Sequence, residues 1–361
     1  MSAPSIAVLK GVILHGGSGT RLRPLTHTGP KQLIKIANKP MSQYALEDLV
    51  SAGITDIAIV LGDVHPERVR EYYGDGSRFG CRITYIQQEK PLGIAHAISL
   101  ARDFVGDDKF VVYLGDNILE GGIAEYARKF EEGDADAMVL LAESDHPRDF
   151  GVAEFDGSGR LVGLVEKPRV PPSNYVLVGI YFLTPSIFDE IARLKPSWRG
   201  ELEITDALRD LLRDGGRLEH AFVRGWWKDT GTPEDLLLAN QRILDRMEAD
   251  FLDGRSVSGR VRLGKGAVVE EGARVVGPAV IGDEAVIGDG AFIGPYTSVA
   301  DGAVIRGAEV ENSIILDGAV LELRGARVVD SIIGAGSRVR AGGSVPRGIR
   351  LILGENSRIE L

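Results

Sequence analysis

The chain has 361 residues, which is enough for two domains and too many for one ordinary core. Its 42 basic and 52 acidic residues give a net charge of −10, which argues against nucleic acid or an anionic membrane as a partner. The single cysteine, Cys81, excludes an internal disulfide and fits a reducing cytoplasm. No signal peptide is visible, and no apolar run approaches the roughly 18 to 20 residues that span a bilayer. We therefore expect a soluble, cytoplasmic, globular protein.

The first part of the chain alternates predicted strands and helices. Residues 8–14 form an apolar run that ends in glycines, 40–52 have helical spacing, 56–61 form a strand, 94–104 a helix and 110–114 a strand. Such alternation predicts an α/β domain that is Rossmann-like, with a mostly parallel sheet and helices on both faces. Thr232 followed by Pro233 is typical of a helix start, and we expect a helix over residues 234–252 that leads to the second part.

The second part is rich in glycine and has a period of six. Residues 255–361 hold 19 glycines and only two aromatic residues. A period of six fits neither a helix nor a plain strand, but it fits a coil in which each hexapeptide forms one flat side. Aliphatic residues mark the period, with a register shift after Ile305 and one exception at Arg327: Leu263, Val269, Val275, Ile281, Ile287, Ile293, Val299, Ile305, Ile315, Leu321, Ile333, Val339, Val345 and Leu351.

This pattern resembles the left-handed parallel β-helix of the hexapeptide-repeat proteins, here with about five coils. Flat sides of such a coil can pack against copies of themselves, so we expect a homo-oligomer. The predicted division is a catalytic domain over residues 1–245 and a β-helix over residues 246–361.

A glycine loop follows the first predicted strand. Gly16, Gly17 and Gly19 would let backbone N–H groups approach phosphate oxygens. The dinucleotide fingerprint fails, because Leu22 stands in place of its third glycine, and the Walker loop fails as well. A tight turn without a ligand is the alternative. Two nearby cations favour phosphate binding, because Arg21 can donate two hydrogen bonds to a phosphate and Lys31 supplies a mobile positive charge. The alternative is that both side chains are only solvated.

Residues 10–26, with Lys31-Gln32-Leu33 and residues 38–41, resemble the signature of sugar-1-phosphate nucleotidylyltransferases. The chain is most similar to the long-form glucose-1-phosphate thymidylyltransferases, also called dTDP-glucose pyrophosphorylases. Further motifs of the family follow in the expected order, with coverage from about residue 8 to 245: residues 88–97, 114–117, 150–152, 165–168, 199–206 and 227–231.

Two residues depart from the family's pattern. His15 replaces a small residue before the paired glycines, and we expect its ring to point away from the nucleotide. Lys35 stands where a proline is common, and we expect it only to alter the loop.

The resemblance implies transfer of a nucleotidyl group from dTTP to glucose 1-phosphate, giving dTDP-glucose and pyrophosphate. The sugar phosphate would attack the α-phosphorus in line. It is mostly a dianion at pH 7, so no general base is required. Positioning and electrostatic stabilisation would carry the rate.

Each role is carried over from the family. Arg21 would clamp pyrophosphate, Lys31 would neutralise the α-phosphate, and Lys167 would contact the phosphate of the sugar. The implied nucleotide-binding residues are Leu14, Gly16, Gly17, Ser18, Gly19, Thr20, Gln32, Gln88, Gly93 and Asp116. The implied sugar-binding residues are Asn117, Gly151, Glu166, Lys167, Tyr181 and Trp227, although Trp227 is equally well explained as a core residue.

The resemblance also implies a metal site. Asp116 and Asp229 would hold Mg2+, which prefers hard oxygen ligands shared with phosphates. For either aspartate alone, a helix cap or a solvated carboxylate is the more common role.

Three alternatives stay open at this stage. UTP or another sugar 1-phosphate could be used. A second, acetyltransferase activity could reside in the β-helix, although residues 221–361 contain no histidine to serve as a base. A non-catalytic assembly subunit would usually have lost the phosphate and metal residues. The other histidines, His27, His65, His96, His146 and His220, follow no ligand spacing and are expected on the surface or in loops.

Overall fold

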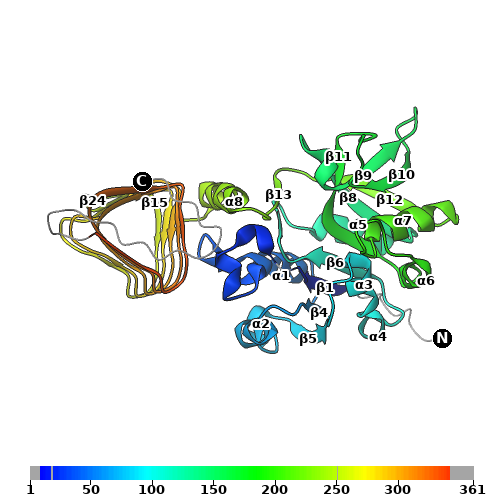
Figure 1. Cartoon of the computed structure of the whole chain (residues 1–361), viewed down its shortest axis with the longest axis horizontal. Helices are drawn as coiled ribbons and strands as arrows, with labels where there is room; N and C mark the ends of the chain where they lie inside the picture. The colour runs from blue at the N-terminus through cyan, green and yellow to red at the C-terminus, as the bar shows by residue number, and fades with distance from the viewer. Residues whose placement is uncertain (1–8, 18, 250, 342–361) are drawn as a thin grey trace. The chain divides into compact units, whose positions relative to one another are not determined.

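The structure is a computed structural model that describes residues 9–17, 19–249 and 251–341. The chain forms two compact units (Figure 1). The first consists of residues 1–19, 28–33 and 41–229, and the second of residues 20–27, 34–40 and 230–361. The second unit thus begins before the predicted boundary at residue 246, and it includes two short segments from the N-terminal part of the chain.

A nine-stranded sheet organises the first unit. Its main path runs β10-β9-β11-β6-β1-β4-β5, and β8 joins β11 to β12. The neighbours β6, β1, β4 and β5 are parallel, as the βαβ pattern predicts, whereas β11 runs antiparallel to β6, β8 and β9. The strands are β1 (Lys10–His15), β4 (Asp56–Leu61), β5 (Arg82–Gln87), β6 (Phe110–Leu114), β8 (Ala137–Glu143), β9 (Gly151–Phe155), β10 (Leu161–Glu166), β11 (Tyr175–Leu183) and β12 (Leu218–Phe222).

Helices cover both faces of this sheet, and each face has its own core. Successive residues of β1 alternate between the two cores: Ile13 lies in one, while Val12 and Leu14 lie in the other. The first core packs against α1 (Met41–Ser51), α2 (Pro66–Tyr73) and α5 (Ala124–Glu132). The second packs against α3 (Ile94–Ser99), α4 (Arg102–Val105), α6 (Ile187–Arg193) and α7 (Ile204–Arg213). Short 3-10 turns are η3 (Lys31–Leu33), η4 (Ser77–Phe79) and η5 (Pro147–Asp149).

The predicted elements of the first unit are largely confirmed. The strands over residues 56–61 and 110–114 have the predicted bounds, and β1 begins at Lys10. The single helix expected over residues 94–104 is wrong, because the chain turns at Leu100 and Ala101 and forms α3 and α4 instead. A small ribbon of β7 (Asn117–Leu119) and β13 (Trp227–Asp229) lies outside the main sheet.

Most of the second unit is a coil of short parallel strands, to which β14 is added antiparallel to β15 (Figure 1, yellow to red). In the first coils residues pair with those three hexapeptides further on, such as Ile281 with Val299. Later pairs are closer in sequence, such as Val299 with Ile315, and the strands stack in successive coils throughout. The strands are β14 (Phe251–Asp253), β15 (Val257–Leu263), β16 (Val268–Val269), β17 (Arg274–Val276), β18 (Ala279–Ile281), β19 (Val286–Ile287), β20 (Phe292–Ile293), β21 (Thr297–Val299), β22 (Val304–Glu311), β23 (Ile314–Ile315), β24 (Val320–Val329), β25 (Ile332–Ile333) and β26 (Arg338–Arg340).

Most of the aliphatic residues that mark the period form the core of the coil. Those from Val275 to Ile305, together with Ile315 and Leu321, are almost completely buried. Leu263 contradicts the pattern, since it belongs to the first coil and is 42% exposed. Arg327 is out of pattern because its own strand, β24, has additional residues between Glu322 and Ala326, opposite Arg306 and Ala308 of β22. The inward position therefore passes to Val328, the partner of the buried Val310. Val345 and Leu351 lie outside the described residues.

Helix α8 (Pro233–Arg246) precedes the coil and has the predicted cap. The Thr232 side chain accepts a hydrogen bond from the Asp235 N–H, and the Asp235 carboxylate accepts one from the Thr232 N–H. The helix is shorter than the predicted 234–252, because the chain becomes extended at Met247 and forms β14.

Segment 34–40 packs within the second unit. It forms a small hairpin of β2 (Lys35–Ile36) and β3 (Lys39–Pro40), and segment 20–27 contributes η1 (Thr20–Leu22) and η2 (Leu25–His27). The fully buried Asn240 accepts a hydrogen bond from the Ala37 N–H at 2.8 Å and donates one to the Tyr296 carbonyl at 2.9 Å. Lys35 pairs with Asp301 at 2.9 Å and Asp317 at 2.6 Å, so it does more than alter the loop.

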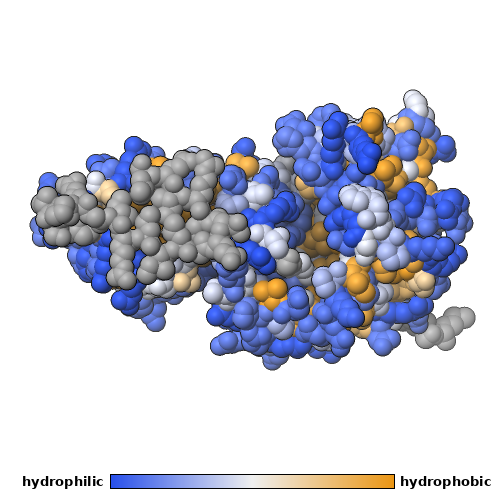
Figure 2. Space-filling view, in the orientation of Figure 1, coloured by the Kyte–Doolittle hydropathy of each residue, from blue (hydrophilic) through white to orange (hydrophobic). Residues whose placement is uncertain are grey.

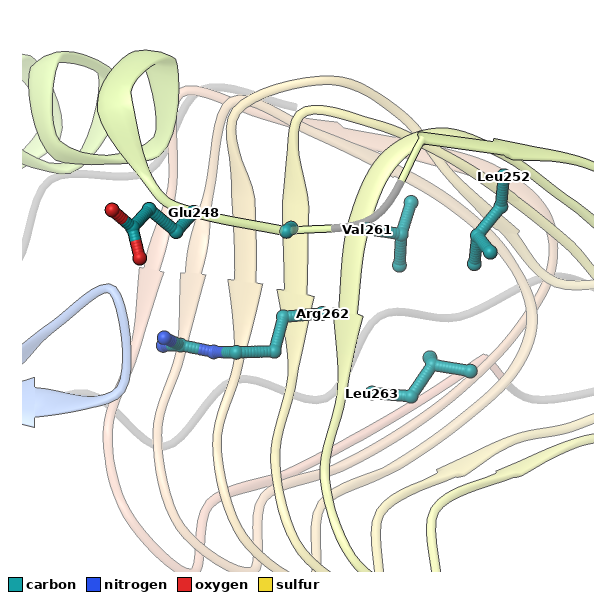
Figure 3. A pocket seen from close by; sticks show the side chains of 6 residues that line it. Glu248, Leu252, Val261, Arg262 and Leu263 are labelled. Atoms are coloured by element: carbon teal, nitrogen blue, oxygen red, sulfur yellow. The ribbon is translucent and has the colours of Figure 1, made fainter.

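Hydrophilic residues cover most of the visible surface of each unit (Figure 2). Within the part of the chain that the structure describes, none of the helices combines the length and the apolar character needed to span a membrane. A cavity of about 740 Å³ belongs to the second unit, beside the first coil. Figure 3 shows Arg262 and Leu263 pointing to opposite sides of β15 there, and no predicted site residue lines this cavity.

Candidate active site

The glycine loop and the aspartate motif meet at the ends of two neighbouring strands. β1 and β6 are parallel with Leu14 beside Leu114, so both strands end at the same edge of the sheet. The Gly115 N–H donates to the Leu14 carbonyl at 3.0 Å, which joins the two loops. Gly17 and Gly19 have φ values of +96° and +59°, a region that glycine adopts without strain. The ends of parallel strands are the usual place for a ligand in an open α/β sheet.

Lys31 and Asp116 form a largely buried ion pair at this edge. Burial opposes ionisation of Asp116, but the Lys31 ammonium and the Asn117 amide outweigh it and lower the pKa of this carboxyl. A Cβ at Gly17 would lie 3.8 Å from Lys31 Nζ, so this cation is also close to the glycine loop. The buried Gln32 donates to the Gly16 carbonyl at 3.0 Å and fixes the start of the loop.

The ribbon of β7 and β13 brings two distant motifs together. Asn117 is paired with Asp229, so the second aspartate lies across from the residue that follows Asp116. The Asn117 amide donates to Asp116 at 3.0 Å and accepts from the Trp227 indole N–H at 2.8 Å. Trp227 therefore orients Asn117, in addition to packing edge-to-face with Phe150.

A cavity of about 170 Å³ opens next to these residues. Thr205 donates a hydrogen bond of 2.6 Å to Glu166, whose pKa is raised mainly by burial. Gly151 leaves space here, because a Cβ would lie 2.8 Å from the Thr205 hydroxyl and 3.2 Å from a Glu166 oxygen. The predicted residues that line this cavity are Asp116, Asn117, Gly151, Glu166, Lys167, Tyr181, Trp227 and Asp229.

The backbone at Lys167 is strained. Its φ is +41°, which is uncommon for a residue other than glycine, and its N–H donates to the Phe150 carbonyl at 3.0 Å. Such strain persists only where the surrounding structure enforces it, and it clusters at functional sites. Here it accompanies a cation that lines the cavity.

Arg199 is a residue of the cavity to which the sequence assigned no role. Its guanidinium pairs with Glu201 at 3.1 Å, Glu203 at 3.3 Å and Glu166 at 3.5 Å. Together with Thr205, these residues line the cavity. The motif over residues 199–206 was noted in the sequence, but only the fold shows that its charged side chains meet Glu166.

Gln88 lies at the end of β5, close to the glycine loop. It is buried, and a Cβ at Gly16 would lie 3.2 Å from its Oε1 atom. Gly93 has a φ of +106°, and a Cβ there would lie only 2.5 Å from the Leu202 carbonyl oxygen. Both the backbone conformation and the lack of space therefore exclude a side chain at Gly93.

Other predicted residues have different surroundings. Leu14 places its side chain in the core. Thr20 and Arg21 belong to η1 in the second unit, where the Arg21 guanidinium lies against Gly231. Ser18 lies outside the described residues.

His96 and His220 are exceptions to the prediction of surface or loop positions, and His15, which that prediction did not include, is buried. His15 is buried beneath the loop, against the edge of Tyr73, and burial lowers its pKa to about 3. Neither of its ring nitrogens has a hydrogen-bond partner among the described residues. His96 lies on α3, and the half-buried His220 belongs to an aromatic cluster with Phe155 and Phe222.

The carboxylates fit a magnesium ion that shares its coordination with a substrate. Asp116 and Asp229 line one cavity and supply the hard oxygen ligands that Mg2+ prefers. No group of three or more histidine, cysteine or acidic residues able to hold a metal ion occurs over residues 9–17, 19–249 and 251–341. Two carboxylates with the remaining positions left to phosphate and water is a common arrangement for this ion.

Comparison with known families gives two matches. A sequence model described as "Nucleotidyl transferase" matches residues 10–246, and one described as "GMPPB C-terminal domain" matches residues 275–360.

Two curated relatives are similar over almost their whole length. The low-salt glycan biosynthesis nucleotidyltransferase Agl11 of Haloferax volcanii is 49% identical, over 98% of this chain and 100% of its own. A glucose-1-phosphate thymidylyltransferase of Streptomyces antibioticus is 45% identical, over 98% and 99%.

Solved structures resemble mainly one part of the chain. A candidate glucose-1-phosphate thymidylyltransferase from Bacillus anthracis, crystallised with sucrose, matches 68% of this chain and 98% of its own, with a TM-score of 0.62 and 41% identity. A UDP-glucose pyrophosphorylase bound to UDP-glucose matches 66% and 100%, with a TM-score of 0.60 and 27% identity.

Proposed function

The chain belongs to the nucleotidyl transferase family and is an enzyme, and on this premise we propose that it makes dTDP-glucose and pyrophosphate from dTTP and glucose 1-phosphate. Relatives named as glucose-1-phosphate thymidylyltransferases support both the sugar phosphate and the base. One observation supports the proposal above all: Asp116, which pairs with Lys31, lines the same cavity as Lys167 and Glu166. The relative bound to UDP-glucose keeps UTP as the alternative nucleotide.

The reaction exchanges one phosphoanhydride bond for another. An oxygen of the sugar phosphate attacks the α-phosphorus of dTTP, and the bond from that phosphorus to the bridging oxygen of the β-phosphate breaks. Pyrophosphate leaves with the electron pair of that bond. Because the attacking phosphate is mostly a dianion at pH 7, no side chain has to remove a proton. The protein must hold two polyanions together and stabilise the charge of the leaving group.

Cations and backbone donors perform these tasks. Lys31 reaches the α-phosphate from beside the glycine loop, and its pairing with Asp116 holds the ammonium in place before substrate binds. Lys167 contacts the phosphate of the sugar, and Arg21 binds the departing pyrophosphate. Backbone N–H groups of Gly16, Gly17 and Gly19 bind the triphosphate.

The sugar is held by the cavity. Glu166 accepts hydrogen bonds from sugar hydroxyls, with its carboxylate oriented by Thr205. Asn117, Gly151, Tyr181 and Trp227 complete the pocket, while Gln88 and Gly93 read the base. When bound, Mg2+ held by Asp116 and Asp229 would neutralise negative charge on the phosphates.

Pyrophosphate release tests this function. Each common NTP is combined with a panel of sugar 1-phosphates, and we expect turnover above all with dTTP and glucose 1-phosphate. Asp229→Ala should abolish turnover, whereas Asp189→Ala should not, because the Asp189 side chain is 74% exposed on α6. Absence of turnover in the wild-type protein with every pair would contradict the proposal, and full activity of Asp229→Ala would contradict the metal assignment.

We also propose that the coil is a left-handed parallel β-helix of hexapeptide repeats and that it mediates a homo-oligomer. The stacking of partners three hexapeptides apart and the buried aliphatic residue of each side support this proposal. Light scattering of the full chain should give a mass larger than 38.9 kDa. A monomer at micromolar concentration would contradict the proposed assembly, and an experimental structure would decide the handedness.

A further inference from the structure

The Gln88 side chain is held by a histidine. Its amide nitrogen Nε2 lies 3.0 Å from Nδ1 of His96, on the first turn of α3. Gln88 is 4% exposed, so its amide has few other partners to choose from. The contact joins the last strand of the parallel set to the helix that follows the predicted base-binding residue Gly93.

This contact fixes the state of both side chains. An amide nitrogen has hydrogens to donate and no lone pair with which to accept. Nδ1 of His96 must therefore be the acceptor, and the ring hydrogen must lie on Nε2. The same contact turns Oε1 of Gln88 away from the histidine, toward the side of Gly16, where a Cβ would lie 3.2 Å from it.

The helix holds His96 firmly in this position. The Ala95 N–H donates to the Leu202 carbonyl at 3.0 Å, and the Ala97 N–H donates to the Gly93 carbonyl at 3.1 Å. The hydroxyl of Ser99 donates to the His96 carbonyl at 2.7 Å. The backbone of the histidine and that of Gly93 thus belong to one turn that these hydrogen bonds hold in place.

On the basis of the proposed function, we propose that His96 is a positioning residue that selects the base by setting the orientation of the Gln88 amide. Thymine and uracil present an N–H between two carbonyl groups. An amide whose oxygen faces the base accepts from that N–H, and its second nitrogen hydrogen can donate to a carbonyl. Cytosine presents an acceptor nitrogen beside an amino group, so it needs the opposite orientation. Anchoring one amide hydrogen on His96 stabilises the orientation that suits thymine and uracil and disfavours the other.

Two variants separate this role from a general structural one. His96→Phe keeps a planar ring but removes the acceptor, so the amide can rotate. His96→Asn places an oxygen near the position of Nδ1 and restores an acceptor. Circular dichroism and thermal unfolding first establish that both variants fold.

Nucleotide selectivity is the readout. The ratio kcat/KM is measured by pyrophosphate release for dTTP and UTP, and the inhibition constant is measured for dCTP. We expect His96→Phe to reduce the preference for dTTP over dCTP by roughly 10-fold, the effect of losing one hydrogen bond. The ratio of dTTP to UTP should not change, because both bases present the same edge. His96→Asn should restore most of the preference.

The outcomes that would overturn the inference are distinct from failure of the proposed function. A preference for dTTP over dCTP that is unchanged in His96→Phe, or an equal loss with all three nucleotides, would refute the role of His96. If the wild-type protein turns over no nucleotide, the proposed function fails; calorimetric binding of dTDP and dCDP to wild type and His96→Phe then decides the role of His96.

A third measurement needs no variant. In wild-type protein labelled with 15N-histidine, NMR should show the His96 hydrogen on Nε2. A hydrogen on Nδ1 in the neutral ring would overturn the inference, whatever the variants do.

Discussion

Removal of the Lys31 charge should destabilise the protein and abolish most activity. The side chains of Lys31 and Asp116 are only 13% and 15% exposed, so neither charge is well solvated alone. Breaking a buried pair by removing one partner costs about 3 to 5 kcal/mol, because the other charge is left uncompensated. We expect Lys31→Met and Asp116→Asn each to lose about 3 kcal/mol of unfolding free energy.

The double variant distinguishes charge coupling from simple loss of packing. Lys31→Met with Asp116→Asn removes both charges, so its loss should be at least about 2 kcal/mol smaller than the sum of the two single losses. Urea unfolding followed by tryptophan fluorescence measures the three values. All three variants should lose about 100-fold or more in kcat, because the double variant regains stability without regaining the cation. Additive stability losses, or recovery of activity in the double variant, would refute the reasoning.

Three further changes test separate parts of the structure. His15→Met should stabilise the protein, and increasingly so as the pH falls below 6.5. The folded state binds the His15 proton only near pH 3, whereas the unfolded chain binds it near pH 6.5, so in this range the histidine lowers the stability of the wild type but not of the variant. Urea unfolding of both proteins at pH 5 and pH 8 measures the difference. Gly151→Ala should raise the KM for the sugar phosphate at least about 10-fold with little change for dTTP in steady-state kinetics, because a Cβ would lie 2.8 Å from the Thr205 hydroxyl. Asn240→Ala should lower the unfolding free energy by about 3 kcal/mol in urea, because the buried Ala37 N–H and the partly buried Tyr296 carbonyl lose their partner. Gln241→Ala, which loses one half-buried contact, should cost less than about 1 kcal/mol, and equal losses would contradict the assigned role of Asn240.

Apolar runs and the period of six predicted several strands and the buried positions of the coil. The strands over residues 56–61 and 110–114 are continuous apolar runs between polar turns, and both appear with the predicted bounds. The period of six predicted the buried positions of the coil because each side repeats the same environment. The pattern failed at Leu263, in the first coil, and at Arg327, where additional residues in its own strand shift the register.

The sequence predicted the site residues that belong to a single motif. It did not predict contacts between side chains from motifs that are far apart in the chain. The pairing of Lys31 with Asp116, 85 residues further along the chain, depends on two strands ending side by side. The sequence contains Arg199 and Thr205, but nothing in their spacing shows that they surround Glu166. The sequence predicts a surface or loop position for His96 because it follows no ligand spacing. Only the fold, which places α3 beside the end of β5, brings its ring to Gln88.

The interleaving of the chain between its two units limits how the molecule can be taken apart. Residues 20–27 and 34–40 fold with the coil, although they lie on either side of a segment that contributes Lys31 to the sheet unit. The coil therefore cannot be removed without affecting the N-terminal part of the chain. A truncation after residue 245 would remove the aspartates that pair with Lys35 and leave the hairpin that contains Ala37 without part of its support. Chimeras that exchange this region between relatives would have to transplant these two N-terminal segments along with it.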